Sequence, residues 1–157
     1  MLFLRKIMIR SSSRLRRGAA LIEFAIIVPL LLLLVFGICE FGLLMKNYLT
    51  ISQAAREGSR TASLGGTTAT IKQRIVNTAT TVTIDPNRIF LDYQDATGVW
   101  MALGDSGTGN NAPVGSLIRV KVEYDHHLLT GYVFPGQATK TLKTEMIMRK
   151  ESGGGPA

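Results

Sequence analysis

The chain has 157 residues, enough for one modest domain beside a membrane segment, and its formal net charge is +7. Six of the 18 Lys and Arg residues precede Gly18, and the residues after it carry 12 Lys and Arg against 11 Asp and Glu. This nearly neutral remainder argues against a nucleic-acid-binding face. The single cysteine, Cys39, excludes an intrachain disulfide.

The basic leader, residues 1–18, precedes an apolar run from Phe24 to Met45. At about 1.5 Å per residue a helix of this length crosses a bilayer. Positive residues beside such a span stay in the cytoplasm, so we expect a single-pass protein with a cytoplasmic N-terminus and an exported C-terminal part. The run lacks the small-x-small site of a cleaved secretory signal, and we expect the helix to remain in the mature protein.

One carboxylate, Glu23, lies at the start of this apolar run. A charge in hydrocarbon costs on the order of 3 kcal/mol, so a partner or a mechanism is expected to neutralise it. Pro29 removes a backbone donor and predicts a kink in the helix. Glu40, near the far interface, is expected to reach water.

The helix is expected to continue beyond the membrane over residues 46–64 and to end at Leu64-Gly65-Gly66. Apolar and small residues recur there at three- and four-residue steps, whereas polar residues occupy another stripe. The apolar seam consists of Leu44, Tyr48, Ile51, Ala55, Gly58 and Ala62, and the polar stripe of Lys46, Thr50, Gln53, Glu57 and Arg60.

Two segments carry a family resemblance. Gly18-Ala19-Ala20-Leu21-Ile22-Glu23-Phe24-Ala25 resembles the processing site of type IV pilin-like precursors, and Pro29 fits that pattern. Ala54-Ala55-Arg56-Glu57-Gly58-Ser59-Arg60 resembles the segment after the membrane helix of the TadE-like family, minor pseudopilins of the Flp (tight-adherence) pilus system. The closing Met148-Arg149-Lys150-Glu151 is a shorter similarity.

The resemblance implies that a prepilin peptidase cuts between Gly18 and Ala19 and that Glu23 and Phe24 guide assembly. It implies a subunit of the bacterial inner membrane that joins other pilins and minor pseudopilins in or at the base of a surface pilus. The implied partners are the peptidase, those pilins, the membrane assembly platform with its ATPase, and membrane lipid, but no nucleic acid.

Residues 65–151 predict an exported α+β head, with a small antiparallel sheet packed on the long helix. A short helix begins at Thr67-Thr68 and places Ile71, Ile75, Ala79 and Val82 on one side. After the turn Asp85-Pro86-Asn87, strands are expected at 88–93, 99–103, 118–125 and about 138–149, with a loop at 104–116 and a flexible tail at 152–157.

The head offers little catalytic chemistry. Its one histidine pair, His126 and His127, lies at a strand end, where adjacent side chains point to opposite faces, so a shared metal is disfavoured. We therefore expect no enzyme, cofactor or metal site. Two alternatives stay open: an uncleaved single-pass membrane protein whose exported domain binds a ligand or partner, and a membrane-anchored hydrolase.

Overall fold

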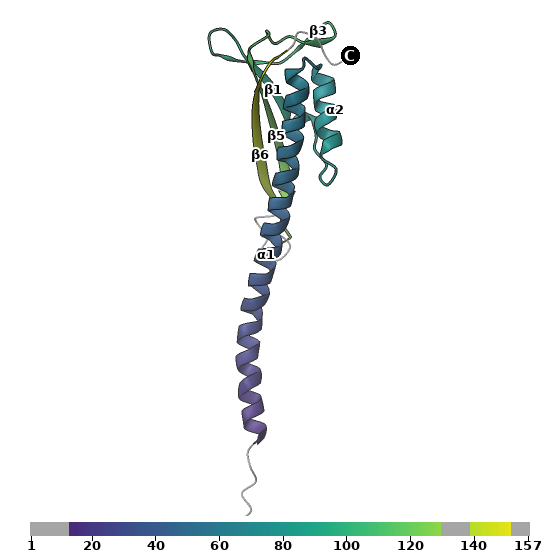
Figure 1. Cartoon of the computed structure of the whole chain (residues 1–157). Coiled ribbons are helices and arrows are strands. Elements are labelled where there is room, and N and C mark those ends of the chain that lie inside the picture. The colour runs from purple at the N-terminus through teal and green to yellow at the C-terminus, as the bar shows by residue number, and fades with distance from the viewer. Residues whose placement is uncertain (1–12, 130–138, 152–157) are drawn as a thin grey trace, which may run out of the picture. The chain divides into compact units, whose positions relative to one another are not determined.

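The computed structural model describes residues 13–129 and 139–151, with side chains from Gly18 onward. It confirms the predicted α+β class: a long N-terminal helix and a small antiparallel sheet (Figure 1). The chain divides into two compact units, Met1–Cys39 and Glu40–Ala157. The predicted leader falls mostly, and the tail entirely, outside the described residues.

The two helices and the four strands of the main sheet follow one another as predicted, with shifts at their ends. In chain order they are α1 (Ser13–Ser63), α2 (Thr68–Thr78), the 3₁₀ turn η1 (Pro86–Arg88), β1 (Ile89–Gln94), β2 (Trp100–Ala102), β3 (Asp105–Ser106), β4 (Gly109–Asn110), β5 (Leu117–His127) and β6 (Thr139–Arg149).

Helix α1 is long and apolar enough to cross a membrane, and it is the one such helix among the described residues. Pro29 lies inside it without ending it, and the kink stays a prediction. The helix ends where Gly65 adopts φ +86°, which a side chain would resist. The amides of Gly65 and Gly66 then donate to the carbonyls of Ala62 and Thr61, both at 3.0 Å, and satisfy the last turn.

Helix α2 ends before the last two residues that were predicted to lie on its apolar side. Thr67 caps it by accepting a bond from the amide of Thr70 at 3.2 Å, but the helix ends at Thr78. Ala79 is the C-cap and Val82 lies beyond the helix, so the prediction of one helical side through Val82 was wrong. Both residues are nonetheless buried in the core.

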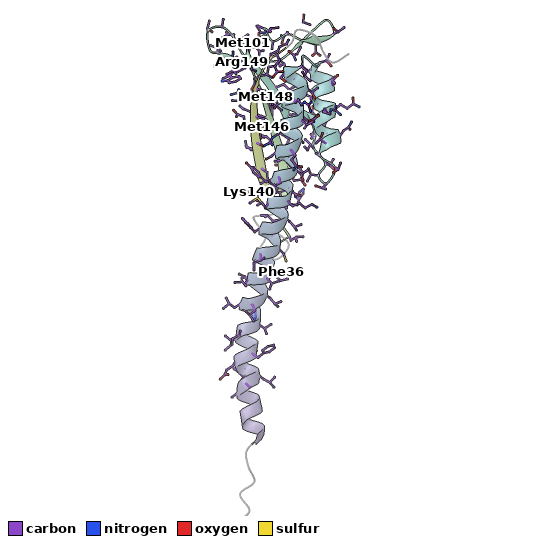
Figure 2. The ribbon with its side chains drawn as sticks, in the orientation of Figure 1. Phe36, Met101, Lys140, Met146, Met148 and Arg149 are labelled. Atoms are coloured by element: carbon purple, nitrogen blue, oxygen red, sulfur yellow. The ribbon has the colours of Figure 1, made fainter. Side chains whose placement is uncertain are left out.

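The sheet has the order β2-β1-β5-β6, and every neighbouring pair is antiparallel. Strand β5 alternates as predicted: Ile118, Val120 and Val122 are fully buried, while the residues between them are partly exposed. In Figure 2, Lys140, Met146, Met148 and Arg149 follow one another along β6, which pairs with β5 over its whole length.

The core joins this sheet face to α2 and to the C-terminal part of α1, through Ile51, Ala54, Ala55 and Ala62 among others. Two details of the prediction were wrong. Tyr48, placed on the apolar seam, is 42% exposed. The segment 104–116 is not wholly loop, because β3 and β4 form a two-stranded ladder that turns at Gly107, with φ +62°.

Candidate functional site

The predicted assembly residues lie on an apolar surface of α1. Ala19, Glu23 and Phe24 are exposed, and the large apolar side chains from Leu21 to Ile38, apart from the partly buried Val28, are at least half exposed. Phe36 in Figure 2 is one of them. A helix that is apolar all round needs lipid or other apolar helices around it. The side chains of this segment are therefore suited to contact with lipid or with another helix.

The predicted cleavage position lies within the same helix. A methyl group added at Gly18 would meet nothing within 4 Å, so no packing fixes the residue as glycine. Ala19 and Glu23 are four residues apart and therefore lie one above the other on the same helical face. An amino group freed at Ala19 would thus emerge on the face that carries the Glu23 carboxylate.

The motif at 54–60 divides into inward and outward residues. Ala54 and Ala55 are fully buried. A methyl group at Gly58 would overlap Cγ1 of Ile75 and lie 2.5 Å from its Cδ1 atom. Small residues on α1 thus allow α2 to approach closely. The inward half of the motif is a helix-packing surface.

The outward half of the motif carries charge. Arg56 and Arg60 are exposed, and Glu57 lies 3.5 Å from Arg74 of α2 in an ion pair at the surface. Exposed pairs of this kind contribute little to stability, about 0–1 kcal/mol. The motif therefore serves the fold of the head through its small residues more than through its charges.

A buried polar cluster joins α1 to the end of β5, and the sequence reading missed it. Glu40, expected to reach water, is only 8% exposed, and its Oε1 atom lies 3.1 Å from Nε2 of His126. The amide nitrogen of Asn47 lies 2.9 Å from Nδ1 of the same ring. With the ring proton on Nε2, His126 donates to Glu40 and accepts from Asn47.

The alternation of β5 is the signal that could have found this cluster. His126 follows Ile118, Val120, Val122 and Tyr124 at two-residue steps and so belongs to the core face. His126 is 4% exposed and His127 is exposed, so the two rings point to opposite faces as predicted. Among the described residues, no three His, Cys, Asp or Glu side chains could together hold a metal ion.

A second buried cluster fastens the C-terminus of α1. The side-chain amide of Asn110 donates to the carbonyls of Ala62 at 2.9 Å and Gly66 at 3.0 Å. Lys150, 3% exposed, donates from Nζ to the carbonyls of Asn110 at 3.0 Å and Ala112 at 2.7 Å. Burial lowers the pKa of Lys150. This lysine, part of the similarity at 148–151, thus holds the end of β6 against the loop that caps α1.

Comparison with known protein families agrees with the resemblance found in the sequence. Residues 18–60 match the family model described as TadE-like protein, a segment that starts at Gly18 and ends at Arg60. The similarity at 148–151 lies outside that match. Comparison with curated proteins and with solved structures gives no match. Residues 18–60 are therefore similar to the TadE-like family, and the apolar helix that they begin could anchor the chain in a membrane.

Proposed function

We propose that the chain is the precursor of a minor pseudopilin of a Flp-type pilus. A prepilin peptidase would cut between Gly18 and Ala19, and the mature subunit would join other pilins through α1. The observation that carries this proposal is the extent of the family match, which begins at Gly18 and includes Glu23, Phe24 and Pro29. The head lies outside that match. It would distinguish this subunit from a pilin that consists of little more than the helix.

The proposed mechanism of assembly is a charge pairing in the membrane. Cleavage would leave a cationic amino group on Ala19, and a neighbour's amino group against Glu23 would cancel two desolvation costs. The pairing would also fix the axial register of two subunits, because Glu23 is the one carboxylate between Ala19 and Cys39. Removal of the six leader charges would precede it, because they hold the N-terminus at the cytoplasmic face.

The proposed partners follow from this mechanism. They are the peptidase, sibling pilins and minor pseudopilins, the assembly platform in the inner membrane and, through it, a cytoplasmic ATPase. Membrane lipid would cover α1 before assembly. We propose a structural role and no catalysis for the head.

Processing can be tested with one substitution and a matched control. Gly18→Leu should block cleavage, because a bulky side chain would stand at the cut bond, while the open space around Gly18 leaves the fold unharmed. Gly37→Leu is the control: the same change on the same helix, also with nothing within 4 Å. Each chain is expressed with and without a prepilin peptidase, and its intact mass is measured.

We expect loss of residues 1–18 from the wild type and from Gly37→Leu, only when the peptidase is present. Gly18→Leu should keep its full mass. A wild-type chain that retains residues 1–18 beside an active peptidase would contradict the proposal. That result would favour the alternative, an uncleaved single-pass protein with an exported binding domain.

A further inference from the structure

The sheet of the head has two open edges. In the described part of the chain, β6 pairs as a strand with β5 alone and β2 with β1 alone, so the order β2-β1-β5-β6 leaves one side of each edge strand open. Such an edge presents backbone N–H and C=O groups that can pair with another chain, and proteins usually protect it with charges, proline or bulges. An edge without this protection is a candidate interaction surface.

Both edges lack this protection over a short apolar stretch. Strand β2 consists of Trp100–Ala102, without a charged residue, and β6 has an uncharged stretch at 146–148. The side chains of Met101, Ile147 and Met148 are 47%, 48% and 37% exposed. The two lysines of β6 precede this stretch, so the protected half of the strand is the other one.

The two apolar stretches lie at the same level of the sheet. Met101 pairs with Tyr93, Tyr93 with Ile118, and Ile118 with Met148, so these residues form one row across the strands. Met101 and Met148 lie toward the same end of the sheet in Figure 2. Residues of one row point to the same face. A second copy displaced sideways, without a shift along the strands, would therefore bring its Met101 beside Met148.

The backbone groups at the two edges also match. The amide of Leu103 donates to β1 at 2.9 Å, so Ala102, the residue before it, turns its N–H and C=O groups to the open edge. The amide of Lys150 donates to the carbonyl of Ser116, beside β5, at 2.8 Å, and by the same alternation Ile147 turns its groups to the open edge. Ala102 and Ile147 also share one row of the sheet. They are placed to form a hydrogen-bonded pair between two copies.

The direction of α1 decides which edges can meet. Strand β6 runs in the same direction as the second half of α1: His126, paired with Lys140 near its start, contacts Glu40, and the amide of Glu151 beyond its end donates to Ser63. Two β6 edges joined by their apolar stretches about a two-fold axis would be antiparallel. Their Glu40 ends would then lie on opposite sides, roughly 40 Å apart. Two chains anchored in one membrane need both of these ends on the same side.

We propose that the heads of two copies of this chain in one membrane join edge to edge, with the β2 edge of one copy paired to the β6 edge of the next. In copies of the same orientation these strands are antiparallel, because three antiparallel steps separate them in the sheet. Ala102 would exchange backbone hydrogen bonds with Ile147, and Met101 would pack on Met148. The contact uses a different surface on each copy, so it can repeat from copy to copy. The proposal rests on the anchoring of α1 in a shared membrane proposed above, but not on cleavage at Gly18.

Cysteine crosslinking in membranes tests this contact. In a Cys39→Ser background, one full-length chain carries Met101→Cys and a second, differently tagged chain carries Met148→Cys. Opposite residues of a pair that is not hydrogen-bonded have Cα atoms about 4.5 Å apart, within the range of a disulfide. The pairing is short, so it is expected between copies that the membrane already holds close together. After mild oxidation we expect a disulfide-linked dimer that carries both tags.

Met146→Cys in place of Met148→Cys is the matched control, because it lies on the same face two residues along the same strand. Its Cα atom would be about 8 Å from that of Met101 in the other copy, which is too far for a disulfide. The pair with Met148→Cys should therefore give about tenfold more dimer than this control, or better.

Ile147→Pro, added to the chain with Met148→Cys, tests the hydrogen bonds themselves. Its N–H group points to the open edge, so proline removes a donor to the other copy and spares the ladder with β5. The dimer should fall to the level of the Met146→Cys control. Thermal unfolding in detergent shows that the head of each variant is folded.

Several results would overturn the proposal. One is as much dimer in the Met146→Cys control, or undiminished dimer in Ile147→Pro. Dimers of Met148→Cys chains alone would show that two β6 edges pair symmetrically. Absence of the mixed dimer would show that another chain or segment, and not a second copy, meets the edge.

Failure of the proposed function is seen separately, from the intact mass of the same chains. Chains that retain residues 1–18, yet form the mixed dimer, would contradict processing and leave this contact standing. Chains that lose residues 1–18 but form no mixed dimer would overturn the contact alone.

Discussion

The close contact between α1 and α2 at Gly58 gives a stability prediction with a built-in control. Gly58→Ala adds one methyl group where Ile75 already lies, and Ile75 is fully buried. Gly42→Ala adds the same group to the same helix, where nothing lies within 4 Å. The two substitutions share the gain in helix propensity and differ in packing alone.

The expected magnitudes follow from these two terms. Alanine is favoured over glycine within a helix by about 1 kcal/mol. Forcing a methyl group into a packed core costs about 1–3 kcal/mol, because the neighbour must leave its rotamer or the helices must part. Gly58→Ala should therefore reduce the free energy of unfolding by up to about 2 kcal/mol, and fall about 1–3 kcal/mol below Gly42→Ala.

The assay is denaturant unfolding in detergent, followed by fluorescence of the single tryptophan. Trp100 is in β2, with the guanidinium of Arg119 4.1 Å from its ring centre, so its emission should report loss of the sheet. In an Ile75→Ala background the overlapping atoms are gone, and Gly58→Ala should become neutral or stabilising. A Gly58→Ala protein as stable as Gly42→Ala would refute the reasoning.

Two further predictions concern the cluster that fastens the end of α1. Asn110→Ala removes the donors to the carbonyls of Ala62 and Gly66 and should cost about 1–3 kcal/mol of unfolding free energy; a loss below about 0.5 kcal/mol would contradict it. Burial lowers the pKa of Lys150 from 10.5 in the folded protein. At pH values between the lowered pKa and 10.5, the unfolded chain therefore binds more protons than the folded chain. The wild type should therefore gain stability relative to Lys150→Met as the pH rises through that range. Urea unfolding of both proteins measures this gain, and a difference between their midpoints that stays constant across the range would contradict the account.

The sequence predicted the elements of the fold well where periodicity was strong. The 22 residues from Phe24 to Met45 indicated a long apolar helix, and the alternation of Ile118, Val120 and Val122 predicted β5 and its buried face. Glycine at 65 and 66 predicted the end of α1, because a left-handed residue is needed there. These signals are local, and local signals can be read from one chain.

The clusters were harder to predict because their members are far apart in the sequence. Glu40 and His126 are separated by 86 residues, and Asn110 and Lys150 by 40. Taken alone, each of these residues is expected at the surface, because polar side chains are mostly exposed and charged ones are rarely buried unless paired. His126 still carried a usable signal, its place on the buried face of β5. For Lys150, no local pattern indicated that its ammonium group would enter the core.

The division of the motif at 54–60 also needed the structure. The sequence showed that these residues resemble a family segment. It did not show that Ala54, Ala55 and Gly58 face the core, with Gly58 against Ile75 of α2, while Arg56 and Arg60 face outward. The family match ends at Arg60, and α2 begins at Thr68. Helix α2, whose Ile75 leaves no room for a side chain at Gly58, thus lies just beyond the matched segment.

The central claim, that α1 joins a neighbouring pilin helix through Glu23, is tested most directly by a photo-crosslink from the next residue. A benzoylphenylalanine in place of Phe24 keeps an aromatic side chain at an exposed position of α1. In cells with the complete pilus system, we expect an adduct with the N-terminal segment of another pilin, identified by mass spectrometry. The adduct should be lost in Glu23→Ala, although that chain still inserts and loses residues 1–18. An adduct of equal yield without the carboxylate would contradict the account.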